Sequence, residues 1–79
     1  MKIKVKRVEK RRETIQIKTE FIKLDAFLKL CDAVQTGGHA KLVVQDGAVR
    51  VNNEICTQRG RKLRPGDSVE FENVIYLVE

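Results

Sequence analysis

TGGHAKLVVQDGAVRVNN, residues 36–53, carries the signals that decide the fold of this chain. Thr36 is a residue type that caps helices at the N-terminus, and Gly47 is suited to the left-handed conformation that ends them. The apolar residues between the two recur at the spacing of one helical face: Ala40, Val43 and Val44. This part of the stretch predicts a short helix that begins after Thr36 and stops at Gly47.

The second half of the stretch predicts a β-hairpin. Val49 and Val51 alternate with a polar residue, which is the period of a half-buried strand. Asn52 and Asn53 tolerate the positive φ angles of a tight two-residue turn. Ile55 then begins the return strand. A helix followed directly by a hairpin therefore forms the centre of the predicted domain.

A second helix is predicted on the N-terminal side of this stretch. Its apolar residues fall at positions i, i+3, i+4 and i+7: Leu24, Phe27, Leu28 and Cys31. This face is expected to lie in the core, while Lys29 and Asp32 point outward.

The first eighteen residues form a basic extension with two interpretations. Residues 2–8 and 13–18 both alternate apolar with polar residues, and a turn at residues 9–12 would join them into a hairpin. The alternative is a loose basic arm in which only Ile15 and Ile17 pair with a sheet. We accordingly divide the chain into this extension, 1–18, and a domain at 19–79.

The C-terminal third predicts a basic loop and two strands. Residues 59–66, RGRKLRPG, are expected to form a loop closed by a Pro-Gly turn. Val69 and Phe71 alternate with polar residues, and after a turn near Asn73 the run 74–78 predicts a final, mostly buried strand.

Composition limits the chain to one small, soluble domain. It has 79 residues, 42% of them hydrophobic and 34% charged. Its longest apolar runs are far shorter than the roughly 20 residues that cross a bilayer, and the N-terminus lacks the apolar segment of a signal peptide. We expect a cytoplasmic protein that contacts no membrane. Cys31 and Cys56 have no zinc-ligand spacing, so two free thiols and no metal are expected.

The positive charge is unevenly distributed. The net charge is +5, yet residues 1–18 hold eight basic and two acidic residues, whereas residues 19–79 sum to −1. Within that near-neutral part, a second basic cluster consists of Arg59, Arg61, Lys62 and Arg64. Two basic patches on a neutral body are typical of a protein that binds a polyanion.

Three segments together resemble the S-four RNA-binding domain, named after the fourth small-subunit ribosomal protein. They are KLDAFLKL at 23–30, TGGHAKLVVQDGAVRVNN at 36–53 and RGRKLRPGDSVEF at 59–71, in the family's order and over more than half of the chain. The pattern is most similar to the small stand-alone bacterial members, the YaaA-like and YbcJ-like proteins, which have a Gly-Gly pair where larger relatives carry an arginine.

The resemblance implies an α+β fold in which two short helices pack on a small, bent antiparallel sheet, the alpha-L RNA-binding motif, with four to six strands. It implies binding to structured RNA, often ribosomal RNA. Lys23 and Gly37 stand where many relatives have arginine, so fewer forked guanidinium contacts are available on the helical ridge. Arg61 and Arg64 are the candidates to compensate.

The candidate RNA-binding residues are outward-facing cations, the glycine pair and their neighbours. They are Lys23, Lys29, Gly37, Gly38, His39, Lys41, Arg50, Asn52, Arg59, Arg61, Lys62 and Arg64. Each has a plainer interpretation: the lysines and Arg50 as a solvated surface, His39 as a surface polar residue, and the glycine pair as a flexible inter-helix turn. The cluster at 59–64 is the firmest prediction, because neighbouring cations repel one another and rarely accumulate without a polyanion.

No residue pattern indicates catalysis. Asp25 is expected in the first turn of a helix and Asp67 after a Pro-Gly turn, so both are interpreted as structural. The sequence contains no nucleophile motif, phosphate-binding loop or metal cluster. Few aromatic residues are present, and at most Phe21 and Tyr76 are expected to be free to stack on bases.

We therefore predict a non-enzymatic module that binds structured RNA, ribosomal RNA or its precursor above all, with the ribosome as a further partner. No cofactor or small-molecule substrate is expected. The alternatives are a protein-interaction module that docks acidic partners through residues 2–12, and sequence-independent DNA binding.

Overall fold

The computed structural model describes residues 10–79 and confirms an α+β fold. Two short helices and seven strands follow one another along the chain. They are β1 (Arg11–Ile15), β2 (Ile22–Lys23), α1 (Leu24–Leu30), α2 (Gly37–Gln45), β3 (Arg50–Val51), β4 (Glu54–Ile55), β5 (Lys62–Leu63), β6 (Ser68–Phe71) and β7 (Val74–Val78).

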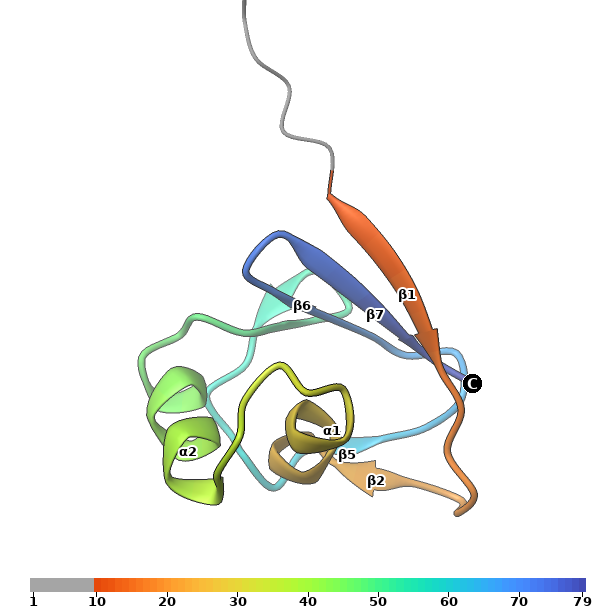
Figure 1. Cartoon of the computed structure of the whole chain (residues 1–79), viewed down its shortest axis with the longest axis horizontal. Coiled ribbons are helices and arrows are strands. Elements are labelled where there is room, and N and C mark those ends of the chain that lie inside the picture. The colour runs from red at the N-terminus through yellow and green to blue at the C-terminus, as the bar shows by residue number, and fades with distance from the viewer. Residues whose placement is uncertain (1–9) are drawn as a thin grey trace, which may run out of the picture.

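The strands form two sheets of unequal size. Five strands make the larger sheet, in the order β1-β7-β6-β3-β4, and β2 pairs with β5 in a separate two-stranded sheet. Figure 1 shows both helices on the same side of the larger sheet, with β2 and β5 beside α1. The helices and the small sheet therefore share one side of the molecule.

The N-terminal part of the described chain forms a strand of the larger sheet, which differs from the hairpin, one of the two interpretations of residues 1–18. β1 runs parallel to β7 over its whole length, from Arg11 opposite Val74 to Ile15 opposite Val78. The turn predicted at residues 9–12 is wrong, because Arg11 and Arg12 belong to β1. Residues 2–8, the other half of that hairpin, lie outside the described residues.

The larger sheet is consequently mixed rather than purely antiparallel, and residues 10–79 hold seven strands rather than four to six. Parallel pairing requires a long connection between the two strands, and here almost the entire domain connects β1 to β7. Local alternation in the sequence predicts a strand at this place, but it does not say which strand becomes its partner.

Helix α1 forms where the apolar spacing predicts it. Leu24, Phe27 and Leu28 are fully buried, and Cys31 is the half-buried residue that caps the C-terminus. Asp32 follows in the left-handed region with φ of 57°, which ends the helix. The side chain of Asp25 accepts a hydrogen bond from the amide of Ala26 at 2.8 Å, so its predicted structural role in the first turn is confirmed.

Helix α2 has the predicted Thr36 cap at its N-terminus and the predicted left-handed Gly47 just beyond its C-terminal cap, Asp46. The Thr36 hydroxyl accepts a hydrogen bond from the amide of His39 at 3.0 Å. Ala40 and Val44 are fully buried. Gly47 has φ of 73° and donates its amide to the carbonyl of Val44. The helix thus lies with one narrow apolar stripe against the core.

Two tight turns connect the antiparallel strands. Asn52 and Asn53 have φ angles of 51° and 70°, which confirms the predicted hairpin between β3 and β4. Glu72 and Asn73 have φ angles of 49° and 65° and join β6 to β7 in the same way. Consecutive positive φ angles match the twist of paired strands, so both turns keep their strands in register.

The core lies between the helices and the larger sheet. The ring of Phe27 on α1 meets the ring of Tyr76 on β7 edge to face, with centroids 6.4 Å apart. The buried core side chains come from both helices, from β3, β5, β6 and β7, and from the connections beside them. They are Leu24, Phe27, Leu28, Val34, Ala40, Val44, Val49, Val51, Cys56, Leu63, Val69, Phe71, Tyr76 and Val78. Tyr76 is therefore not available to stack on a base.

The difference between a core residue and a surface residue of α1 provides a test of this packing. Phe27→Ala should lower the free energy of unfolding by about 3–5 kcal/mol, because it removes a fully buried ring and leaves a cavity. Leu30→Ala is the matched control on the same helix, since 52% of Leu30 is exposed. Urea unfolding followed by circular dichroism measures both; equal losses would contradict the core described above.

Candidate nucleic-acid interface

The basic loop is attached to the first turn of α1 by backbone hydrogen bonds. The amide of Leu24 donates to the carbonyl of Arg61 at 2.8 Å, and the amide of Asp25 donates to the carbonyl of Arg59 at 3.1 Å. Amides in the first turn of a helix have no partner within the helix. The loop supplies those partners, so its backbone and the helix start form one rigid unit.

The small sheet brings a further cation to the same unit. Antiparallel pairing places Lys23 of β2 directly opposite Lys62 of β5, and Ile22 opposite Leu63. Directly opposed residues project from the same face of a sheet. Because Leu63 is fully buried, the two lysines leave the sheet on its exposed face.

Five exposed cations thus lie on two segments that are hydrogen-bonded to each other, the start of α1 with β2 and the basic loop with β5. We call these cations the basic cluster. Its members are Lys23, Arg59, Arg61, Lys62 and Arg64. Within residues 10–79, ion pairs join Lys10 to Glu70 at 2.7 Å and Arg11 to Glu13 at 3.9 Å, and no member of the basic cluster takes part in one. Its positive charge is therefore not neutralised by the described part of the protein.

One member of the basic cluster has an aromatic partner. The Lys62 ammonium lies 4.8 Å from the centre of the Phe21 ring, within the range of a cation–π contact. The half-buried Phe21 is thereby covered on one face. Of the two aromatic residues expected to be free to stack on bases, Tyr76 is in the core and Phe21 is engaged by Lys62.

The candidate residues of α2 are all exposed and lie in its first half. Gly37 and Gly38 belong to the helix itself rather than to the turn before it, and His39 and Lys41 follow them. A methyl group added to Gly37 would meet nothing within 4 Å, and one added to Gly38 would meet only the Thr36 hydroxyl at 4.0 Å. Internal packing therefore does not require glycine at either position.

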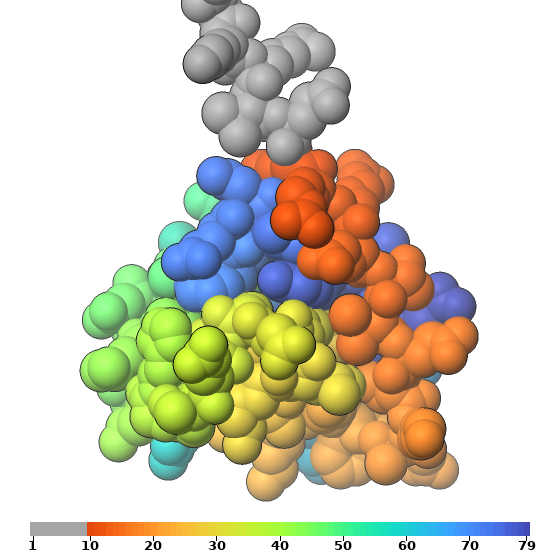
Figure 2. All heavy atoms as spheres, viewed as in Figure 1, coloured from red at the N-terminus to blue at the C-terminus, as the bar shows by residue number. Residues whose placement is uncertain are grey.

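Figure 2 shows the face of the molecule on which both helices lie, with the chain from β1 to β2 along one edge.

Two further predicted residues, Lys29 and Arg50, lie outside the basic cluster. Lys29 is exposed in the last turn of α1, at the opposite end of the helix from the basic cluster. Arg50 is exposed on β3, where Val51 is buried, so the Arg50 side chain leaves the sheet on the face opposite the core. The structure does not bring Lys29 or Arg50 together with the basic cluster.

Asn52 is engaged in holding the end of the basic loop. Its side-chain oxygen accepts a hydrogen bond from the amide of Ser68 at 2.9 Å, and its amide nitrogen donates to Asp67 at 3.2 Å. Asp67 also accepts from the amide of Arg64 at 2.8 Å, which confirms its predicted structural role. These bonds give Asn52 a structural task in addition to its predicted contact with RNA.

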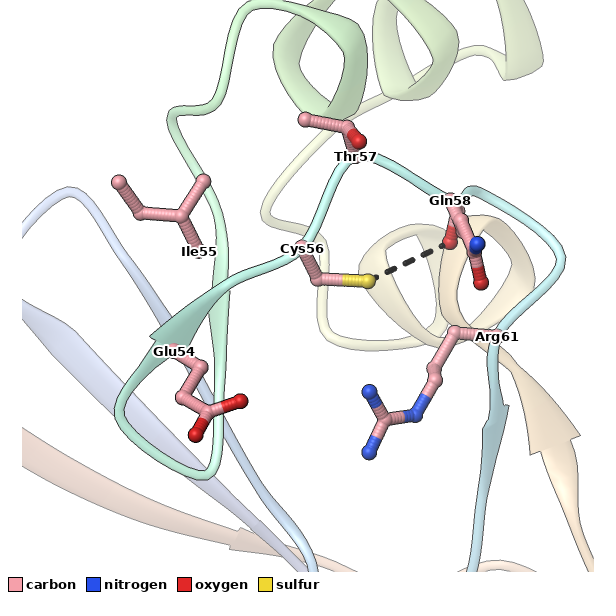
Figure 3. Close-up of a pocket in the computed structure, with 6 residues that line it drawn as sticks. All are labelled: Glu54, Ile55, Cys56, Thr57, Gln58 and Arg61. Carbon is pink, nitrogen blue, oxygen red and sulfur yellow. Dashed lines mark hydrogen bonds between the residues drawn. The ribbon is translucent and has the colours of Figure 1, made fainter.

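A shallow pocket adjoins the basic cluster, and sequence patterns did not indicate it. It has a volume of about 230 Å³ and is lined by Glu54, Ile55, Cys56, Thr57, Gln58 and Arg61. Figure 3 shows Arg61 entering it from the basic loop, opposite the β3–β4 hairpin. The Cys56 thiol, which also lines the pocket, donates to the carbonyl of Gln58 at 3.6 Å. All six lining residues fall within residues 54–61, and the course of the chain from β4 to the basic loop places Arg61 across the pocket from Glu54.

Among the titratable groups of residues 10–79, the thiol of Cys31 has a strongly raised pKa. Burial, together with the negative charges of Glu13 and Asp32, raises the pKa of Cys31 to about 12. This thiol is therefore protonated at neutral pH and poorly suited as a nucleophile. No three His, Cys, Asp or Glu side chains in this part of the chain are grouped as metal ligands. Neither of its helices is long and apolar enough to cross a membrane.

Comparison with known proteins agrees with this architecture. Residues 15–79 match the S4 domain. This chain belongs to the S4 domain family. A relative in Bacillus subtilis (strain 168), described as "Probable ribosome maturation protein RlbA", is 52% identical over 58 residues, which span 73% of this chain and 82% of that protein. The matched residues contain the three segments between 23 and 71, so the resemblance to the S-four domain is confirmed.

The asparagine pair of this S4 domain allows the hydrogen bonds of Asn52 to be separated from its backbone conformation. Asn52→Gly keeps the positive φ but removes the bonds to Ser68 and Asp67, so it should lower the free energy of unfolding by about 1–3 kcal/mol. Asn53→Gly is the matched control, because Asn53 also has a positive φ but makes no side-chain hydrogen bond within residues 10–79. Chemical denaturation of the two variants measures the difference. A loss as large in the Asn53 variant would show that the side-chain bonds contribute little.

Proposed function

We propose that this S4 domain is a non-enzymatic module that binds structured RNA, namely ribosomal RNA or its precursor, during ribosome maturation in the cytoplasm. The observation that carries the proposal is the basic cluster, whose five exposed cations are held on a backbone fixed to α1 and lack acidic partners within residues 10–79. The description of the Bacillus subtilis relative as a probable ribosome maturation protein supports the choice of RNA.

The geometry of the basic cluster favours contacts with phosphates. Lysine and arginine side chains on a fixed backbone can neutralise several phosphates at once and release their counterions. The described aromatic residues offer no exposed stacking platform, since Tyr76 is buried and Phe21 lies beneath Lys62. Recognition of folded RNA through its shape and backbone fits this surface better than recognition of a single strand through its bases.

A charge-reversal experiment tests the assignment of the surface. Lys23→Glu combined with Lys62→Glu reverses two cations that lie directly opposite each other on the exposed face of the small sheet. We expect this double variant to bind a structured ribosomal RNA fragment at least about 100-fold more weakly, because two charged phosphate contacts are worth about 1.5–3 kcal/mol each.

The matched control is Arg12→Glu combined with Lys18→Glu, which removes the same amount of positive charge at exposed positions outside the basic cluster. Filter binding at fixed salt compares the two, and circular dichroism checks that both are folded. A control variant that loses as much affinity would show that net charge, rather than the basic cluster, governs binding. Full affinity in the Lys23 and Lys62 variant would refute the proposed interface, and capture of an acidic protein instead of RNA would favour the interaction-module alternative.

A further inference from the structure

The pocket beside the basic cluster has walls of opposite charge that do not neutralise each other. Figure 3 shows the Glu54 carboxylate and the Arg61 guanidinium facing one another across the open space. Their oxygen and nitrogen atoms are not within the 4.0 Å of an ion pair, in contrast to Lys10 and Glu70. Both side chains are exposed, so each has hydrogen-bonding capacity available for a third group.

The backbone keeps the two walls apart. Glu54 belongs to β4, where its pairing with Val51 of β3 fixes its place in the hairpin. Arg61 is fixed from the other side, because its carbonyl accepts the hydrogen bond from the amide of Leu24. The opening between the hairpin and the basic loop is thus a feature of the fold.

The charges of the walls limit the chemistry of the ligand. A phosphate would be attracted by Arg61 but repelled by Glu54. A metal ion or an ammonium group would be attracted by Glu54 but repelled by Arg61. A neutral group with hydrogen-bond donors on one edge and acceptors on another can donate to the Glu54 carboxylate and accept from the Arg61 guanidinium. Among the bases of RNA, guanine has this arrangement: its N1–H and N2 amino group can donate to a carboxylate, and its O6 and N7 accept from arginine.

Adenine does not fit these walls. It presents an acceptor, N1, where guanine presents a donor, so Glu54 would face a lone pair. Gln58, which also lines the pocket, has a side-chain amide that can serve either base and does not change this preference. The selectivity therefore depends on Glu54.

We propose that this pocket receives an unpaired guanine of the bound RNA, with Glu54 holding its N1 and N2 edge and Arg61 its O6 and N7 edge. The inference rests on the proposed RNA-binding function and adds base selectivity to a surface that otherwise contacts phosphates. Base selectivity of this kind distinguishes one folded RNA from another, which the basic cluster alone does not do.

The experiment compares one RNA hairpin with a single bulged nucleotide that is guanine, inosine or adenine, with the same hairpin lacking the bulge. The full chain should bind the guanine bulge about 10-fold or more tightly than the adenine bulge, the size expected for one bidentate base contact. Inosine lacks the N2 amino group and should give an intermediate affinity.

Glu54→Gln should lose the preference for guanine over adenine, whereas Glu72→Gln, an exposed glutamate in the turn between β6 and β7, should keep it. Whether Glu54→Gln weakens or strengthens binding of the guanine hairpin separates base recognition from binding through phosphates alone. If binding involved phosphates alone, Glu54→Gln would bind every hairpin at least as tightly as the unmodified chain does, because it removes a negative charge.

The outcomes separate the two proposals. Equal binding of the guanine and adenine bulges by the unmodified chain would overturn the guanine pocket and leave RNA binding intact. A preference for guanine that persists in folded Glu54→Gln would overturn the assignment of Glu54. Failure to bind any of the hairpins, or other structured RNA, would overturn the RNA-binding function and the pocket with it.

Discussion

Two backbone hydrogen bonds, from Leu24 to Arg61 and from Asp25 to Arg59, join the start of α1 to the loop that follows the β3–β4 hairpin. They meet a general requirement, since the first amides of a helix need acceptors from outside it. In most helices a side-chain cap or water serves as the acceptor, but α1 has no side-chain cap at Lys23. The helix start therefore depends on the loop, and the arginines of the loop acquire a defined place because the helix fixes their carbonyls.

The rest of the candidate interface depends on this junction. The β2–β5 pair continues it and places Lys23 next to Lys62. Asn52 and Asp67 hold the far end of the loop through the amides of Ser68 and Arg64. The same junction sets one wall of the pocket that faces Glu54. A cationic segment that would otherwise be an ordinary solvated loop is thus held at both ends, and it loses little conformational entropy when it meets a partner.

Much of the fold could be predicted from local sequence patterns because local physics determines it. The apolar face of α1, the Thr36 cap, the left-handed Gly47 and the Asn52–Asn53 turn each depend on residues within a few positions. The parallel pairing of β1 with β7 could not be predicted in this way, because its two strands come from opposite ends of the domain. Neither could β2 and β5, which have two residues each and are too short to show a period.

The candidate site shows the same division. Sequence patterns indicated the cations of the loop, since a local concentration of charge is visible without a structure. They did not indicate that Arg50 and Lys29 lie apart from the basic cluster, that Asn52 is engaged with Ser68 and Asp67, or that Glu54 faces Arg61. Each of these facts depends on how separate elements are placed relative to one another in three dimensions, and no spacing rule within one element carries that information.

Amide chemical-shift mapping shows whether the basic cluster and the start of α1 form one RNA-binding surface. A ¹⁵N-labelled chain is titrated with a structured ribosomal RNA fragment, and the shift of each backbone amide is followed in the described residues. We expect the largest changes at residues 23–25 and 58–64, while Arg50 and the strands β6 and β7 of the larger sheet change little. Changes concentrated on the outer face of that sheet, with residues 58–64 unaffected, would contradict it.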